Sequence, residues 1–130
     1  MTRLFSIIYF SCLMISGSGY FQADPSSEII DAFRKGNPID LGKYLNEMVD
    51  LNIPGFKDSY SKTQASRIIK DFFSNKPVSS ISVSREGNSS DGSKYTMGNL
   101  TAGGKKYSLY FLLRKTNGEY RIYQLHIQSE

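Results

Sequence analysis

The segment YSKTQASRIIKDFFSNKP, residues 60–77, carries the pattern that decides the fold. Apolar side chains recur there at helical spacing along one side. They are Ala65, Ile68, Ile69, Phe72 and Phe73. Ser61 followed by Gln64 has the form of a capping box, so we predict a helix over residues 61–75. The opposite side is polar and is expected to face water; it carries Lys62, Ser66, Arg67 and Lys70.

From Val78 onward the apolar pattern changes from helical spacing to alternation. Alternation is typical of half-buried strands, and it predicts strands over residues 78–87, 93–102, 105–116 and 119–128. The pairs Gly103-Gly104 and Asn117-Gly118 predict tight turns between the last three strands. The sequence therefore predicts a four-stranded antiparallel meander, which the apolar side of the preceding helix would cover.

The chain before this helix predicts two more helices and one strand. One helix is predicted over residues 24–36, where Asp24 suits the cap and Gly36 the end. A short helix over residues 37–45 and a short strand over residues 47–55 follow. This order predicts the α+β class. We expect a curved antiparallel sheet, built from the C-terminal meander and the short N-terminal strand, with about three helices packed on one face.

Residues 1–23 have the pattern of a secretory signal peptide: a short basic start, the apolar run LFSIIYFSCLMI, and a small polar end. The run is shorter than the roughly 20 apolar residues that span a bilayer. A retained membrane anchor is the competing interpretation. We place cleavage after Ala23, with Gly19 as the alternative. This leaves one domain over residues 24–130, which we expect to be periplasmic or extracellular with no membrane span. Cys12 lies in the removed segment, so the mature chain has no disulfide and no thiol nucleophile.

The mature chain carries a modest positive charge. Once Arg3 is removed with the signal peptide, fifteen Lys and Arg residues stand against twelve Asp and Glu residues, a net charge of +3. Both signs are scattered along the sequence. This distribution predicts a solvated basic surface and no nucleic-acid partner.

The two tight turns fix which strand residues lie opposite one another, and side chains then alternate between two faces. The first set, expected under the helices, is Tyr95, Met97, Tyr110, Leu112, Tyr123, Leu125 and Ile127. The second set, expected on the outer face, is Thr96, Gly98, Leu100, Tyr107, Leu109, Phe111, Leu113, Ile122, Gln124 and His126. A bulge in either strand would exchange the assignment locally.

The second set mixes large apolar groups with polar ones, which is intermediate between a core and a solvated face. Monomers rarely expose contiguous apolar patches beyond a few hundred Å². We therefore predict a homodimer through this face, with an interface of Leu100, Tyr107, Leu109, Phe111, Leu113, Ile122, Gln124 and His126. The competing interpretation is that the sheet curls enough to bring these residues inside a pocket.

His126 is the one histidine of the chain, and an imidazole beside a carboxylate can transfer a proton near neutral pH. No spacing ties Asp40 or Asp50 to it, so we assign no catalytic residue. One histidine without a mature cysteine also predicts no metal site, and no motif predicts a cofactor.

Tyrosine is unusually frequent, with nine in the chain, and many fall on predicted strands. Packing between strands is the simpler interpretation, because aromatic side chains favour strands. The functional interpretation is a cleft for a small apolar or sugar-like ligand, lined by Tyr95, Tyr110 and Tyr123. A tyrosine offers such a ligand a flat apolar ring with a hydroxyl at its edge.

Several short motifs resemble one family of secreted bacterial proteins. The motifs YSKTQA, DFF, YTMGNL and YQLHIQ, together with Gly87, are similar to the family called domain of unknown function 4783. This resemblance spans the mature chain. It implies a cone-shaped α+β domain of the nuclear transport factor 2-like (NTF2-like), cystatin-related superfamily. The family has no assigned activity, so the resemblance implies a fold and a compartment but no mechanism.

We therefore expect an exported, non-enzymatic binding or interaction module. The competing hypotheses are a small lyase or isomerase that uses the pocket of the cone, and a purely structural homodimer. A buried His–Asp or Tyr–Asp pair beside an internal cavity would favour the enzyme. The molecular mass in solution would identify the dimer.

Overall fold

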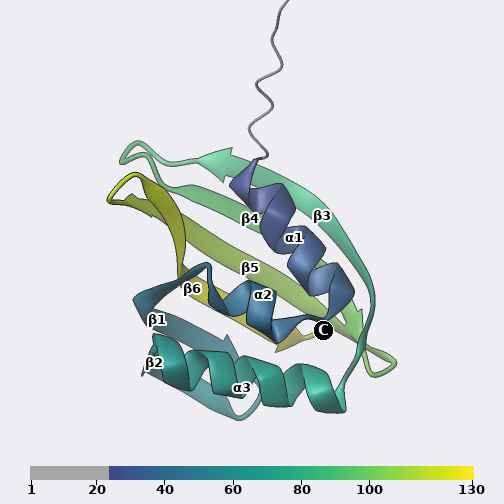
Figure 1. Cartoon of the computed structure of the whole chain (residues 1–130). Coiled ribbons are helices and arrows are strands. Elements are labelled where there is room, and N and C mark those ends of the chain that lie inside the picture. The colour runs from purple at the N-terminus through teal and green to yellow at the C-terminus, as the bar shows by residue number, and fades with distance from the viewer. Residues whose placement is uncertain (1–23) are drawn as a thin grey trace, which may run out of the picture.

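The chain forms one six-stranded sheet with three helices (Figure 1). The computed structural model describes residues 24–130, and the predicted signal peptide, residues 1–23, lies outside the described residues. The helices are α1 (Pro25–Lys35), α2 (Pro38–Gly42) and α3 (Lys62–Asn75). The strands are β1 (Leu45–Ile53), β2 (Phe56–Ser61), β3 (Val78–Asn88), β4 (Lys94–Ala102), β5 (Lys105–Thr116) and β6 (Glu119–Ser129). They lie in the order β2-β1-β6-β5-β4-β3.

The helix ends follow the local chemistry that the sequence predicts. At α3 the Gln64 backbone N–H donates to the Ser61 hydroxyl at 3.2 Å, and the Ser61 backbone N–H donates to the Gln64 side chain at 3.3 Å. The predicted capping box is therefore confirmed. At α1 the Asp24 carboxylate accepts from the first turn, and Gly36 ends the helix in the left-handed conformation with φ of 62°.

The predicted α+β class is confirmed, with two differences in the sheet. The prediction lacks β2, which pairs only with β1 at the edge of the sheet. Its sequence FKDSYS offers no fully buried side chain, so it lacks the alternation on which the prediction depends. The second difference is that β1 runs parallel to β6, whereas the remaining pairs are antiparallel.

Both predicted hairpin turns are present, but one strand contains an extra residue. Asn117 and Gly118 have positive φ values of 52° and 83°, as a type I′ turn requires. Leu113 pairs with Ile122 as predicted, yet Leu112 pairs with Gln124, so Tyr123 is the extra residue of a bulge. Every β6 residue beyond the bulge is shifted by one position relative to the predicted register.

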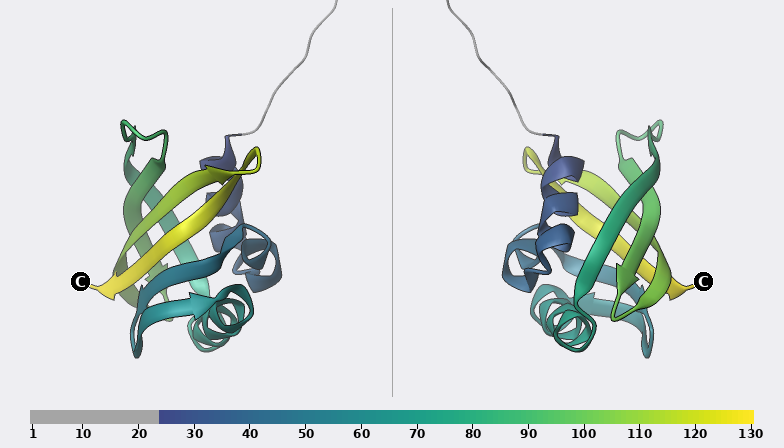
Figure 2. Two further views of the ribbon diagram at one scale, coloured as in Figure 1. Left: turned by 90° about the vertical axis from the view of Figure 1, so that its left-hand side faces the viewer. Right: turned by 90° about the vertical axis from the view of Figure 1, so that its right-hand side faces the viewer.

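The predicted faces of β4 and β5 are inverted, and the bulge exchanges the faces of the β6 residues beyond it. The three helices lie on the concave side of the sheet (Figure 2). The strand side chains packed beneath them are Leu100, Tyr107, Leu109, Phe111, Leu113, Ile122, Leu125 and Ile127. The prediction that the first set lies under the helices is therefore wrong, except for Leu125 and Ile127, which the bulge turns inward. Gln124 and His126, expected beside Phe111 and Leu109, lie opposite Leu112 and Tyr110 instead.

Glycine at position 98 allows the sheet to curl at its far edge. A side chain there would collide with the carbonyl oxygen of Ser82 on β3. The register of β3 and β4 shifts beside this point, between Val83 and Arg85. A bulge of this kind bends a strand and increases its twist, so the edge strand curves towards α1.

Candidate functional site

The predicted dimer interface is mostly core. The strand residues Leu100, Tyr107, Leu109, Phe111, Leu113 and Ile122 are each at most 2% exposed in a single copy of the chain. The Phe111 ring stacks on Phe33 of α1 at 6.2 Å between centroids, and Tyr107 meets Phe72 of α3 edge-on at 5.6 Å. The assignment of these six residues to an outer face is therefore wrong. Of the predicted interface, Gln124 and His126 alone lie on the open side of the sheet, because the Tyr123 bulge turns them outward.

The open, convex side of the sheet carries the tyrosines that the sequence singles out. We call this surface the convex face; it comprises Tyr95, Met97, Tyr110, Leu112, Tyr123, Gln124 and His126. The Tyr110 and His126 rings lie opposite each other, with their centroids 5.4 Å apart. Met97 pairs with Tyr110 and is 41% exposed. Partial burial, with a smaller contribution from Tyr95, raises the pKa of the Tyr110 hydroxyl.

Tyr123 forms the end of the convex face nearest β1. Its hydroxyl is 2.8 Å from the Thr116 hydroxyl, and the Arg114 guanidinium lies 5.2 Å from its ring centroid. A shallow cavity of about 220 Å³ opens beside it, lined also by Met48 and Leu112. Met48 is 54% exposed, so an apolar side chain extends this surface onto β1.

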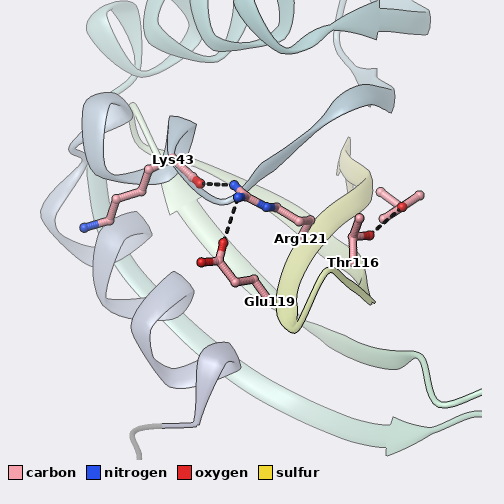
Figure 3. Close-up of polar contacts among 5 residues, drawn as sticks. Lys43, Thr116, Glu119 and Arg121 are labelled. Atoms are coloured by element: carbon pink, nitrogen blue, oxygen red, sulfur yellow. Dashed lines mark hydrogen bonds and ion pairs between the residues drawn. The ribbon is translucent and has the colours of Figure 1, made fainter.

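The Arg121 guanidinium links the start of β6 to the segment just before β1. The Arg121 guanidinium donates to the Lys43 carbonyl at 2.9 Å and to the Glu119 carboxylate at 2.7 Å (Figure 3). One residue further on, the Ile122 backbone N–H donates to the Tyr44 carbonyl at 2.7 Å. These bonds fix the segment between α2 and β1 against the sheet.

Tyr44 is the most strongly perturbed titratable group of this region. Its hydroxyl donates to the Glu28 carboxylate of α1 at 2.8 Å. Burial, the hydrogen bond to Glu28 and the negative charges of Glu28 and Asp40 raise the pKa of Tyr44 to about 12. The hydroxyl is thus held as a hydrogen-bond donor at neutral pH, which suits a structural link between α1 and the segment that joins α2 to β1.

The concave side is filled by the protein's own aromatic side chains. Phe33, Phe72, Phe73, Tyr107 and Phe111 contact one another through ring pairs with centroids between 5.2 and 6.2 Å apart. Among residues 24–130, the buried polar side chains are Ser26, Ser93 and Thr96. The Thr96 hydroxyl is buried without a hydrogen-bond partner. Neither His126 nor an aspartate belongs to this interior.

The described residues contain neither a metal-binding cluster nor a membrane-spanning helix. Between residues 24 and 130, no group of three or more His, Cys, Asp or Glu side chains is arranged to hold a metal ion. In the same part of the chain, no helix is both long and apolar enough to cross a membrane.

Comparison with known proteins identifies the family. The sequence model of the family described as domain of unknown function (DUF4783) matches residues 26–128. The chain belongs to this family. The resemblance predicted from the short motifs is thereby confirmed. Among curated proteins, none matches the chain.

Solved structures agree with this assignment. The DUF4783 protein of Bacteroides uniformis is 31% identical with a TM-score of 0.77, and the alignment covers 82% of this chain and 98% of that one. The DUF4783 protein of Bacteroides fragilis is 30% identical with a TM-score of 0.75, covering 82% and 100%. An NTF2-like protein of unknown function from Cytophaga hutchinsonii is 17% identical with a TM-score of 0.57, covering 81% and 86%, which shows the NTF2-like fold alone.

In this DUF4783 domain the predicted tyrosines share one face, whereas the sequence does not predict the basic cavity beside α3. Tyr95, Tyr110 and Tyr123 lie on three neighbouring strands of one face. The cavity lies between α3 and the end of α2, and Lys62 and Lys70 line it. The helical pattern places these lysines on a water-facing side. Only their proximity to α2, which is distant in sequence, distinguishes a cavity from an ordinary solvated surface.

Proposed function

We propose that this DUF4783 domain is an exported, non-enzymatic binding module whose convex face binds a sugar-like ligand. The observation that carries the proposal is the placement of Tyr95, Tyr110 and Tyr123 on the open side of three adjacent strands. Strands are spaced about 4.8 Å apart, so these rings extend over roughly 10 Å across the sheet. A surface of this length suits a short saccharide chain better than a single small molecule.

The polar side chains around the tyrosines support a sugar-like ligand over a purely apolar one. Gln124 and His126 offer amide and imidazole groups between the rings, and Arg114 lies over Tyr123. Half-buried aromatic rings interleaved with hydrogen-bonding groups can recognise a ligand whose faces are apolar and whose edges carry hydroxyls. The packed concave side is the reason for preferring this face over a pocket in the cone.

Export is the second part of the proposal and rests on the pattern of residues 1–23. N-terminal sequencing of the product from the native host is expected to begin at Asp24, or at Tyr20 if cleavage follows Gly19. A full-length product in the cytosol would contradict export while leaving the ligand proposal intact.

Titration with soluble oligosaccharides tests the ligand. The chain has no tryptophan, so its intrinsic fluorescence comes mainly from its tyrosines, among them Tyr95, Tyr110 and Tyr123. We expect saturable changes with at least one saccharide class. Tyr110→Ala or Tyr123→Ala is expected to weaken binding by roughly tenfold, as for loss of one aromatic anchor. Phe56→Ala is the matched control, because Phe56 is an exposed aromatic on β2, outside the convex face.

A second copy of the chain is the competing occupant of the convex face. Light scattering at micromolar concentration separates the two, because the ligand proposal expects the mass of a monomer. A dimer that Met97→Lys dissociates would replace the sugar-like ligand by self-association. Full saccharide binding by Tyr110→Ala would remove the convex face from the proposal.

A further inference from the structure

The positive charge of this domain gathers around one cavity between α2 and α3. The cavity has a volume of about 500 Å³, within the range of ligand sites. Its charged and hydroxyl-bearing lining residues are Lys43, Lys62, Thr63, Ser66, Arg67 and Lys70, and no acidic residue lines it. We call it the basic groove.

The charge distribution sets this groove apart from the rest of the surface. Residues 24–130 carry fifteen Lys and Arg side chains against twelve Asp and Glu side chains, a net charge of +3. The groove alone contributes four cations. The remainder of the domain therefore has one more negative than positive side chain. The two ion pairs described between residues 24 and 130 use Arg34 and Arg121, so neither neutralises the groove.

The first turn of α3 adds to this unbalanced positive charge. The other helices carry an acid in the first turn, Glu28 in α1 and Asp40 in α2, which complements the positive end of a helix. The first turn of α3 has no acid and begins with Lys62. The charge of Lys62 thus adds to the positive end of the helix dipole. A bound anion would be attracted by both positive charges and would reduce their mutual repulsion.

The two walls of the groove are fixed in position. The Lys43 carbonyl accepts from Arg121, and the Lys43 ammonium lies 5.5 Å from the Tyr44 ring centroid. A side chain at Gly42 would bring its Cβ to 3.0 Å from the Ser66 hydroxyl, so α2 ends in close contact with α3. The cations therefore face a preformed concavity.

We infer that the basic groove binds a linear, phosphate-bearing polyanion. Lys62 and Lys70 are eight residues apart on α3, which places them about 12 Å apart along the helix axis. A single phosphate is too small to contact both ends, whereas a chain of phosphates can contact each cation in turn. Each phosphate oxygen can accept several hydrogen bonds. The ammonium and hydroxyl groups of the groove together supply the donors for these bonds.

Other anions fit the groove less well. Single-stranded nucleic acid is bound with aromatic rings on which its bases stack, and no aromatic side chain lines the groove. An anionic membrane is a flat surface, whereas these cations line a concavity between two elements. An acidic peptide can match the charge of the four cations, but its carboxylates stand on flexible side chains, whereas a polyphosphate carries its charges and acceptor oxygens along the chain itself.

Calorimetric titration of the mature domain with linear inorganic polyphosphate tests this inference. We expect affinity to rise from orthophosphate to tripolyphosphate to longer chains, and to fall with added salt. The double variant Lys62→Gln/Lys70→Gln is expected to bind at least roughly tenfold more weakly, because two charge-assisted contacts are lost. The matched control is Lys105→Gln/Lys106→Gln, which removes the same charge from the exposed start of β5, outside the groove, and is expected to change affinity less than about twofold.

Each remaining outcome overturns the inference. Equal affinity for orthophosphate would show a site for a single anion. Equal affinity for oligodeoxythymidine, for tetraglutamate or for vesicles of phosphatidylglycerol would replace the polyphosphate by that class. Equal losses in the groove and control variants would show nonspecific attraction to net charge. Circular dichroism of both variants checks that each is folded, since the substituted lysines lie on the surface. Saccharide binding by the convex face is measured separately, so either proposal can fail without the other.

Discussion

The two faces of one sheet differ in chemistry although they alternate along the same strands. On β5, Phe111 is fully buried against α1, while its neighbour Tyr110 is partly exposed beside His126. On β6, Leu125 faces the core while Gln124 faces outward. The concave face is almost purely apolar, and the convex face mixes aromatic, thioether and amide groups. A sheet with these two faces can remain folded through one side and interact through the other.

One extra residue in β6 decides which side chains of the rest of that strand face the core. Without the bulge at Tyr123, Gln124 and His126 would lie in the row of Phe111 and Leu109, and Leu125 would be turned outward. With the bulge, every buried β6 side chain lies with the apolar residues of β5. The inserted residue thus completes the separation of core from surface.

The largest expected effect comes from placing a charge on each face in turn. Phe111→Lys is expected to abolish cooperative unfolding. The substitution removes about 3–5 kcal/mol of packing energy. Burial of an unpaired ammonium costs several kcal/mol more. Together these losses are comparable to the roughly 5–15 kcal/mol that stabilises a whole domain. Tyr110→Lys, one position away, is expected to unfold within about 1 kcal/mol of the wild type. Urea denaturation followed by circular dichroism compares them. A folded Phe111→Lys monomer would restore the original assignment of the faces.

The next effect tests the bulge itself. Deletion of Tyr123 forces β6 either to shift its register or to strain the hairpin. A shifted register would expose Leu125 and bury Gln124 and His126, and each buried polar side chain would cost about 1–3 kcal/mol. We expect a loss of stability larger than that of any single core truncation. Tyr123→Ala keeps the residue count and is expected to cost about 1 kcal/mol. Amide hydrogen exchange on β6 follows the register, and equal stability of the two variants would show that the bulge is dispensable.

Much of the fold is predictable from local chemistry. The capping box at Ser61, the left-handed Gly36 and the Asn117-Gly118 turn each depend on residues adjacent in sequence. The bulge is different, because YRIYQLHIQ contains no glycine or proline to mark an extra residue. Its position is decided by which β6 side chains fit under the helices. β2 was missed for a related reason, since it is held mainly by backbone pairing to β1 and not by a buried apolar row.

The candidate sites also differ in how far they depend on local sequence and on contacts between distant residues. The predicted tyrosines share one face because alternation over β4 and β5 survives intact, and the register between these strands is as predicted. Which face the helices cover depends instead on contacts between residues distant in sequence, such as Phe33 of α1 on Phe111 of β5. The basic groove depends on contact between Gly42 and Ser66, which are far apart in sequence. A periodic pattern on α3 alone cannot distinguish a wall of a cavity from a solvated surface.

An intermediate effect compares one truncation on each side of the sheet. Phe73→Ala is expected to destabilise the domain by about 3–5 kcal/mol, because its ring packs edge-on against Phe33 and Phe72 in the core. Met97→Ala, on the convex face, is expected to cost less than about 1 kcal/mol, since the side chain is 41% exposed. Urea midpoints of both variants give the contrast. Equal midpoints would mean that α3 is not anchored to the sheet through Phe73.

The smallest expected effect is a difference between two tyrosine titrations. Tyr44 has a pKa of about 12 through burial and its bond to Glu28, while the pKa of Tyr110 is raised by partial burial and by Tyr95. Both folded values lie above the ordinary 10.0, so the stabilisation is fully present below that pH and is lost as pH rises through the folded pKa. Tyr44→Phe is therefore expected to flatten the fall in stability between pH 10 and about 12.

Tyr95→Phe sharpens this contrast, because it removes one phenolate from the convex face and leaves Glu28 untouched. We expect the pKa of Tyr110 to fall only part of the way towards its ordinary value, since burial is the larger cause and remains. The pKa of Tyr44 is expected to stay unchanged. Carbon NMR of ring-labelled tyrosine resolves the two groups and measures both. If the Tyr44 titration moved with the Tyr110 titration, the shift would come from a change in the whole fold. An unchanged Tyr110 would mean that the two rings do not sense each other's charge, and that the convex face is less closely packed than a continuous binding surface requires.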